Sequence, residues 1–323
     1  MHPAIPISLV FIGCCSNVVF LELIVKEHHG AGNLITFMQF LFVAAEGFIF
    51  TVNFGTKKSV IPLKVYGFMV SFFFVVQVIN NYAFNFKIPM TLHIIFRAGS
   101  LIASLVLGVL ILKRKYPISK HLSVIMITIG ICACTWASAD SHEADEGESV
   151  EHFVFNYVMG VGTLVLSLFL TARMGIYQET IYKEYGKHPK ESLFFNHALP
   201  LPGFLMVAPD IYKHVLLFNQ SDPVGFTSLG LTIPKMWLFL AGNVITQYIC
   251  IRSVFILTTE CSALTVTLVV TLRKFASLIL SIVYFKNPFT LLHWLGASLV
   301  FIGTFIFTEV LPLKKKEVEK KRQ

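Results

Sequence analysis

Apolar runs, each long enough for a membrane-spanning helix, alternate with short polar stretches along almost the whole chain. A helix needs about 20 predominantly apolar residues to cross a hydrocarbon core of about 30 Å. The pattern therefore predicts an all-α integral membrane protein with ten transmembrane helices. The expected spans are Ile5–Val25, Leu34–Phe54, Pro62–Phe84, Ile88–Leu112, Ile118–Ser138, Phe153–Ile176, Leu193–Pro209, Met236–Leu257, Cys261–Phe285 and Leu291–Leu311.

The composition supports a membrane protein and excludes several other classes. Of the 323 residues, 55% are hydrophobic and 14% are charged, and 31 are Phe. Soluble domains carry about 25% charged residues, so a soluble enzyme, a disordered protein and a coiled coil are excluded. A net charge of +8 would also fit a nucleic-acid partner, but the cations gather in short loops and in the C-terminal tail. We therefore interpret them as topology signals and expect a lipid bilayer rather than nucleic acid.

The distribution of Lys and Arg predicts the orientation of the helices. With ten spans both termini share one side, and that side carries 16 of the 26 Lys and Arg residues against five on the other. By the positive-inside rule, both termini are expected in the cytosol. The acidic stretch Asp140–Glu151 and the sequon Asn219-Gln220-Ser221 fall on the opposite side. Asn219 is therefore a predicted lumenal glycosylation site.

Two short segments recur in the same order and indicate internal duplication. Glu22-Leu-Ile-Val-Lys26 returns as Glu179-Thr-Ile-Tyr-Lys183, and Ser100-Leu-Ile-Ala-Ser104 returns as Ser277-Leu-Ile-Leu-Ser281. The duplicated unit has five spans, and because five is odd the second copy would enter the membrane from the opposite side. Such inverted repeats are typical of secondary transporters, which hold the substrate near the midplane. The expected parts are a first repeat (1–138), an acidic lumenal loop (139–152), a second repeat (153–311) and a basic cytosolic tail (312–323).

Cations in the middle of predicted spans mark a candidate binding site. A cation at the centre of a membrane helix costs about 2.5–3.5 kcal/mol on insertion scales. Lys274 shares a helical stripe with Thr271 and Ser277, and Arg97 shares the corresponding stripe of the first repeat with Ser100. Two such stripes facing each other would suit a dianionic phosphate ligand, which both cations could hold through charge-assisted hydrogen bonds.

Alternatives stay open for several of these residues. The two cations could instead form structural ion pairs, for instance with Glu22, and Glu22 itself could bind a sugar, carry a proton or be structural. Arg273 lies about 100° around the helix from Lys274 and has apolar helical neighbours, so its place in the site is uncertain. Polar residues on the third and eighth spans could stack on a base and read its edge, or form interhelical hydrogen bonds. These residues are Asn81, Tyr82, Gln247 and Tyr248.

Catalytic, cofactor-binding and metal-binding motifs are absent from the sequence. There is no G-x-S-x-G, H-E-x-x-H or Walker motif, so neither an enzyme nor an ATP-driven pump is expected. None of the six Cys belongs to a C-x-x-C pair, and we expect buried free thiols rather than a metal site or a disulfide framework. We predict no cofactor and no metal.

Four stretches carry a resemblance to a known family, namely Asn80–Phe84, Phe86–Arg97, Leu264–Phe275 and Asn287–Gly296. In these stretches the chain resembles the nucleotide-sugar transporters of the drug/metabolite transporter superfamily. The resemblance implies ten helices and an antiport cycle in which cytosolic UDP-sugars enter the Golgi or endoplasmic reticulum lumen and UMP returns. UDP-xylose and UDP-N-acetylglucosamine are the implied UDP-sugars. The resemblance also implies that Lys274 contacts phosphate.

The C-terminal sequence adds a prediction about sorting. Lys320 and Lys321 lie fourth and third from the end and fit a cytosolic dilysine signal that a coat protein would recognise, although a basic tail that sets topology is the alternative. A homodimer is a further hypothesis. Competing functions are an ion-coupled exporter of other small metabolites on the same fold and a membrane-embedded transferase. Cationic cargo would favour acidic midplane residues, and a transferase would need a catalytic carboxylate or His cluster.

Overall fold

The structure is a computed structural model that describes residues 4–86, 88–141, 150–186, 188–226, 231–260 and 263–309. Its α-helices are α1 (Ala4–Glu27), α2 (Gly32–Phe50), α3 (Leu63–Tyr82), α4 (Met90–Ala98), α5 (Ser100–Leu110), α6 (Ile118–Ser141), α7 (Val150–Tyr185), α8 (Pro189–Ala198), α9 (Ala208–Asn219), α10 (Lys235–Glu260), α11 (Ala263–Phe285) and α12 (Leu291–Phe307). Two 3₁₀ helices, η1 (Ala83–Phe86) and η2 (Leu201–Val207), extend α3 and join α8 to α9. The strands β1 (Pro223–Phe226) and β2 (Leu231–Pro234) form an antiparallel hairpin beyond α9.

The helices confirm a predominantly α-helical, multi-pass membrane protein. Within the described residues, eight helical segments are long and apolar enough to cross a membrane. The last apolar helix, α12, has 17 residues. The count of ten spans and the inverted repeat remain predictions.

Prolines decide where several helices begin and break. Pro62 and Pro89 stand directly before α3 and α4, where a residue without an N–H group removes no intrahelical hydrogen bond. The predicted span Leu193–Pro209 falls within Lys190–Asn219, a segment long and apolar enough to cross a membrane. Within it the helix is interrupted, since α8 gives way to η2 at Pro200 and α9 continues to Asn219. A proline inside a helix removes one hydrogen bond and clashes with the preceding turn, which explains the interruption.

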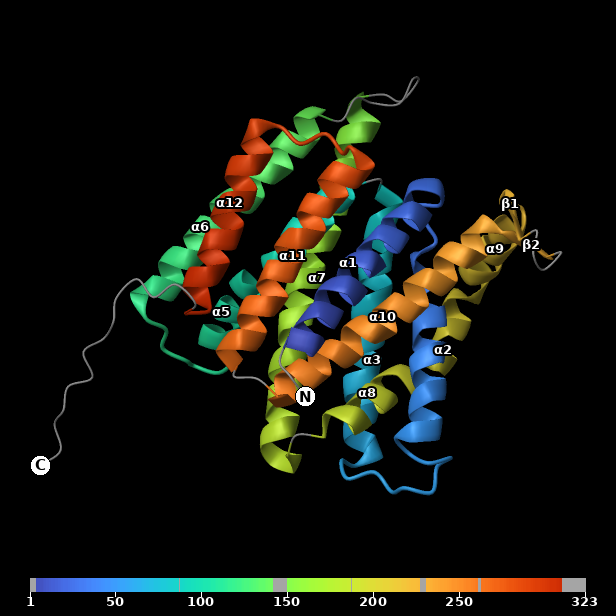
Figure 1. Cartoon of the computed structure of the whole chain (residues 1–323). Helices are drawn as coiled ribbons and strands as arrows, with labels where there is room; N and C mark the ends of the chain where they lie inside the picture. The colour runs from blue at the N-terminus through green and yellow to red at the C-terminus, as the bar shows by residue number, and fades with distance from the viewer. Residues whose placement is uncertain are drawn as a thin grey trace, which may run out of the picture.

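Small residues allow the closest helix pairs to form. At Gly13 of α1, a β-carbon would stand 2.9 Å from the backbone nitrogen of Cys250 in α10, and at Gly130 of α6 it would stand 2.5 Å from the carbonyl oxygen of Gly296 in α12. Contacts this short exclude any larger side chain, as is usual where membrane helices touch. Figure 1 shows α6 and α12 side by side at one edge of the bundle, with α9 and the hairpin at the opposite edge.

A disulfide bond corrects the prediction of free thiols. Cys14 of α1 is bonded to Cys250 of α10, with 4.7 Å between their α-carbons. The two residues are 236 positions apart, so only the packing of α1 on α10 brings them together. Of the other described cysteines, Cys15 and Cys134 are buried and free, whereas Cys132 is free and exposed.

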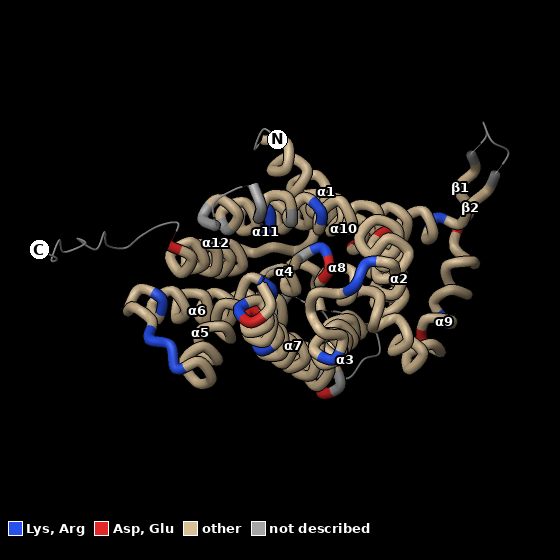
Figure 2. The backbone as a smooth tube through the Cα atoms, turned by 90° about the horizontal axis from the view of Figure 1, so that it is seen from below, with Lys and Arg blue, Asp and Glu red and all other residues tan. Residues whose placement is uncertain are grey.

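Several predictions fall on parts of the chain outside the described residues. These are the dilysine signal of Lys320 and Lys321, the tail at 312–323, positions 142–149 of the acidic loop, and Cys261. Among the described loops, the connection between α5 and α6 carries Lys113, Arg114 and Lys115 and is a blue segment at the end of the bundle shown in Figure 2.

Candidate functional site

A cavity of about 430 Å³ lies inside the bundle, between α1, α2, α3, α4, α7, α10 and α11. A volume of this order suits a small-molecule site, since such sites enclose about 300–1,000 Å³. Helices from both predicted repeats contribute to its walls. Five of the eleven binding residues predicted from the sequence line it, namely Arg97, Lys274, Asn81, Gln247 and Ser100.

Arg97 and Lys274 bring two positive charges to one wall of the cavity. The Nζ atom of Lys274 donates a hydrogen bond of 3.4 Å to the backbone carbonyl of Arg97, which joins α11 to α4. The side chain of Arg97 is exposed although it lies within the bundle, because it faces the cavity. In the part of the chain that the structure describes, no Asp or Glu lines the cavity or forms an ion pair with either residue.

The helix that carries Arg97 is interrupted beside it, at Gly99 between α4 and α5. A β-carbon at this position would stand 2.3 Å from the Cδ1 atom of Ile131 in α6, so glycine allows α6 to pack against the break. The two helices nevertheless form one segment, Met90–Leu110, that is long and apolar enough to cross a membrane.

Amide side chains occupy another wall of the cavity. Asn81 of α3 donates hydrogen bonds to Thr36 (2.9 Å) and Asn33 (3.3 Å) of α2. Gln39, one helical turn along α2 from Thr36, donates to Asn243 of α10 at 2.7 Å. These groups offer donors and acceptors that could exchange their interhelical hydrogen bonds for bonds to a ligand.

Gln39, Asn17 and Gln77 line the cavity and are absent from the set predicted from the sequence. Each lies inside a predicted span, so the rule that intramembrane polar groups face a cavity or a partner helix would have selected them. His93 also lines the cavity, and its buried Nε2 atom has no hydrogen-bond partner in the described structure.

Six predicted binding residues lie outside the cavity lining. Tyr82 is 56% exposed and meets Phe86 edge to face, at 5.4 Å between ring centroids. Thr271 is buried, and Ser277 donates a hydrogen bond to the sulfur of Cys15 at 3.5 Å. The remaining three are Tyr248, Glu22 and Arg273.

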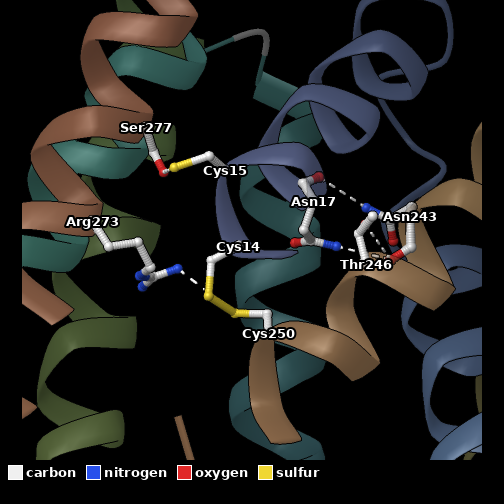
Figure 3. The surroundings of a disulfide bond; sticks show 8 residues. All are labelled: Cys14, Cys15, Asn17, Asn243, Thr246, Cys250, Arg273 and Ser277. Carbon is white, nitrogen blue, oxygen red and sulfur yellow. Dashed lines mark hydrogen bonds between the residues drawn. A yellow bond between two sulfur atoms is a disulfide. The ribbon is translucent and has the colours of Figure 1, made fainter. Parts of the chain in front are cut away.

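Arg273 extends toward the disulfide bond (Figure 3), and it is not among the residues that line the cavity. Its Nη1 atom lies 4.0 Å from the sulfur of Cys250, and its buried Nε atom has no hydrogen-bond partner in the described structure. The apolar helical neighbours of Arg273 in the sequence agree with this separation from Lys274, because adjacent residues on a helix point about 100° apart.

Tyr248 belongs to an ion-pair cluster between α2 and α10. Its hydroxyl donates to the carboxylate of Glu46 at 2.7 Å, and the same carboxylate forms an ion pair with Arg252 at 3.0 Å. The guanidinium of Arg252 also lies over the ring of Tyr248, at 5.6 Å from the centroid. Tyr248 therefore serves the contact between the two helices.

Glu22 lies in the contact between α1 and the end of α11 and is 1% exposed. Its carboxylate accepts hydrogen bonds from Ser281 and Asn287, both at 2.6 Å. Lys26 lies 3.7 Å from the same carboxylate. Glu22 thus satisfies local partners and leaves the two cavity cations unpaired.

Asn219, the predicted glycosylation site, is the last residue of α9 and is exposed. Its Oδ1 atom accepts a hydrogen bond from the indole of Trp237 at 2.8 Å. Nearby, the ammonium group of Lys235 forms ion pairs with Asp222 (2.8 Å) and Glu27 (3.1 Å). The hydrogen bond that Lys235 donates to Asp222 lowers the pKa of that carboxyl below its usual range.

The fold and the cavity are those of a multi-pass helical membrane protein with a polar site between its helices. A solved crystal structure covers 94% of this chain and 97% of its own, with a TM-score of 0.54 and 15% sequence identity, which supports the fold alone. The sequence profile of the UAA transporter family matches residues 2–311, and the chain belongs to this family.

Full-length relatives agree with the family. The chain is 56% identical to the "UDP-xylose and UDP-N-acetylglucosamine transporter" of Danio rerio, covering 96% of this chain and 95% of the relative. It is 55% identical to the "Nucleotide sugar transporter SLC35B4" of Homo sapiens, with the same coverage. It is 53% identical to the "Endoplasmic reticulum GDP-fucose transporter" of Drosophila melanogaster, covering 94% and 89%. The resemblance to nucleotide-sugar transporters and the exclusion of an enzyme are both confirmed.

Proposed function

We propose that this protein is an antiporter that moves cytosolic UDP-N-acetylglucosamine and UDP-xylose into the Golgi or endoplasmic reticulum lumen and returns UMP by alternating access. The observation that carries the proposal is the pair Arg97 and Lys274, which face one cavity without an acidic partner in the described structure. Two uncompensated cations inside a membrane protein cost about 5–7 kcal/mol on insertion scales, so a doubly negative diphosphate would offset a large penalty.

The polar groups around these cations suit the other parts of a nucleotide sugar. We assign the phosphates to Arg97 and Lys274, with Ser100 as a further donor, and the uracil base to Asn81 and Gln247. Amide groups can match both the donor and the acceptor positions on the edge of a base. The six predicted residues outside the cavity lining are left out of this site.

Helix packing supports ten spans in two inverted repeats. In this scheme α1, α3, α4–α5 and α6 correspond to α7, α10, α11 and α12. The structure contains matching contacts, because α1 packs on α10 and α11 while α7 packs on α3 and α5. The counterparts α6 and α12 pack on each other. The proposed repeats cover 1–138 and 153–311, and the substrate lies between them near the midplane.

The proposed topology places both termini in the cytosol and Asn219 in the lumen. Sealed microsomes test it, because a C-terminal tag should be digested by external protease while a glycan on Asn219 should be protected. A protected tag would contradict the topology. The dilysine signal, its recognition by a coat protein and a homodimer stay hypotheses that the microsome experiment does not test.

A second candidate substrate follows from the Drosophila relative, whose name specifies GDP-fucose and whose identity of 53% is close to that of the UDP-sugar transporters. The phosphate site proposed here would accept either diphosphate. Selectivity between UDP-sugars and GDP-fucose must therefore come from contacts of the base with the amide groups of the cavity.

Purified protein in liposomes tests the function directly. Vesicles loaded with UMP should accumulate radiolabelled UDP-N-acetylglucosamine and UDP-xylose, and vesicles without UMP should accumulate much less. Unlabelled GDP-fucose should compete weakly. Uptake that is independent of trapped nucleotide, or that follows an imposed proton or sodium gradient, would instead favour the ion-coupled exporter.

A further inference from the structure

Glu22 and its partners seal one end of the contact between α1 and α11. Ser281 and Asn287 both donate to the Glu22 carboxylate at 2.6 Å, and Asn287 also bonds to the carbonyl of Ser281 at 3.2 Å. Lys26 adds a hydrogen bond to the carbonyl of Phe285 at 3.3 Å. Glu22 is 1% exposed, so buried hydrogen bonds hold this end of α1 against the end of α11.

A corresponding group stands at the other end of the molecule, near the end of α7. The repeat places Glu179 at the position of Glu22 and Lys183 at the position of Lys26, and Glu179 likewise pairs with Lys183, at 2.9 Å. Its second partner is Arg114. In Figure 1, α1 and α7 run in opposite directions, so the two glutamates lie at opposite ends of the bundle.

The partners of the two glutamates also correspond in backbone geometry. Lys286, after α11, has φ = 53°, and the next residue, Asn287, donates to Glu22. Lys113, after α5, has φ = 52°, and the next residue, Arg114, donates to Glu179. A positive φ is uncommon outside glycine, so both helix ends carry a similar tight turn, which comes nine residues after Ser104 and five residues after Ser281.

The two groups differ in how completely they are closed. The side chain of Glu179 is 40% exposed, against 2% for Glu22. Ser104 is the counterpart of Ser281, but its hydroxyl bonds to the Ser100 carbonyl of its own helix at 2.9 Å. One end is therefore sealed by a buried carboxylate, and the other carries the same parts in an open arrangement.

We propose that Glu22 and Glu179 are the paired latches of the transport cycle, and that the structure shows the state with the Glu22 latch closed and the Glu179 latch open. In the opposite state, Glu179 turns inward to accept a hydrogen bond from Ser104 while Glu22 leaves Ser281 and becomes exposed. With the proposed topology, the structure is open to the cytosol. The inference rests on the proposed exchange function, because exchange needs both states.

Chemical crosslinking tests the latches in the full-length protein. The background variant keeps Cys14 and Cys250 and has Ser at the other four cysteines. One reporter adds Glu179→Cys with Ser104→Cys, and a short bifunctional thiol reagent followed by peptide mass spectrometry measures the crosslinked fraction. Adding Glu22→Gln removes a charged acceptor from the opposite latch. The crosslinking rate between positions 104 and 179 should then rise about tenfold, the lower range for losing a charge-assisted hydrogen bond.

Glu184→Gln provides the matched control, because Glu184 is an exposed glutamate on the same helix as Glu179. It should leave the rate unchanged. If Glu22→Gln does not fold, Ser281→Ala removes one donor to Glu22 and should give a rise of about threefold. Equal rates with and without the change at Glu22 or Ser281 would overturn the latch proposal.

Exchange of UDP-N-acetylglucosamine for trapped UMP by the unmodified protein separates the two proposals. Exchange without any response in the crosslinking rate contradicts only the latches. A tenfold rise in the crosslinking rate without exchange contradicts only the proposed function. The two latches would then be coupled in a transporter of another substrate.

Discussion

The central cavity and the ion-pair cluster between α2 and α10 each contain an arginine from a predicted span, but they surround its charge differently. At the contact, Arg252 meets the carboxylate of Glu46 at 3.0 Å and the ring of Tyr248 at 5.6 Å from the centroid. In the cavity, Arg97 has Lys274 beside it and no acidic partner in the described structure. One site is complete as it stands, whereas the other gathers like charges around an open volume.

The difference indicates which intramembrane charges belong to function. An ion pair between neighbouring helices satisfies its own charge, so it stabilises the contact and needs no ligand. Two adjacent cations repel each other and cost free energy until an anion arrives. A polar residue in a span is therefore a weak indication of a binding site until its partners are known.

Among the variants that distinguish the two regions, Lys274→Ala should have the largest effect on ligand affinity. Losing a charge-assisted hydrogen bond of about 1.5–3 kcal/mol should weaken binding about 10- to 150-fold. UDP-xylose, UDP-N-acetylglucosamine and UMP should all be affected, because all three carry phosphate. Ligand-dependent thermal stabilisation of the purified variant measures the loss. A folded Lys274→Ala protein with unchanged affinity would contradict the phosphate assignment.

Asn81→Ala should have a smaller and more selective effect. A neutral hydrogen bond contributes about 0.5–1.5 kcal/mol, so the affinity for UMP should fall about 2- to 12-fold. The preference for UMP over GMP should narrow, because Asn81 is assigned to the base. Tyr82→Ala is the matched control, since Tyr82 is the next residue but does not line the cavity. Equal losses from both variants would contradict the assignment.

More of the architecture than of the candidate site could be predicted from the sequence. The length of an apolar run is a local property of the sequence, so the helices appear close to where they were expected. Pro200 and the following residues interrupt the seventh segment because a proline removes a backbone donor, and hydropathy alone does not register this. The Cys14–Cys250 bond depends on which helices touch, and a spacing of 236 residues carries no such information.

The binding site itself stays a prediction, but the positions of its residues could be anticipated where helical direction could be reasoned. The stripe argument placed Lys274 on a polar helical face and left Arg273 open as a binding residue, and the structure has the two side chains in different surroundings. The same argument could not separate Ser100, which lines the cavity, from its counterpart Ser277, which bonds to Cys15. That separation depends on asymmetry between the two halves, which a repeated sequence conceals.

Glu46→Ala should affect stability and leave ligand affinity unchanged. Arg252 is 40% exposed and Glu46 is 13% exposed, so removing the carboxylate should lower the free energy of unfolding by about 1 kcal/mol or less. Thermal unfolding without ligand measures this change, and the ligand-induced rise in Tm should match that of the unmodified protein. A large loss of affinity would show that the α2–α10 contact is part of the binding site after all.

Arg273→Ala should have the smallest effect on binding and is the sharpest comparison with Lys274→Ala. The two cations are adjacent in sequence, yet Arg273 points toward Cys250 at 4.0 Å while Lys274 lines the cavity. Arg273 does not line the cavity, so its removal should cost a long-range charge interaction but no direct hydrogen bond to phosphate, and affinity for UMP should fall by about threefold. The measurement is UMP-dependent thermal stabilisation of both variants under identical salt. If Arg273→Ala weakens binding as much as Lys274→Ala, then the charge of the whole stripe, and not the direction of each side chain, determines phosphate affinity.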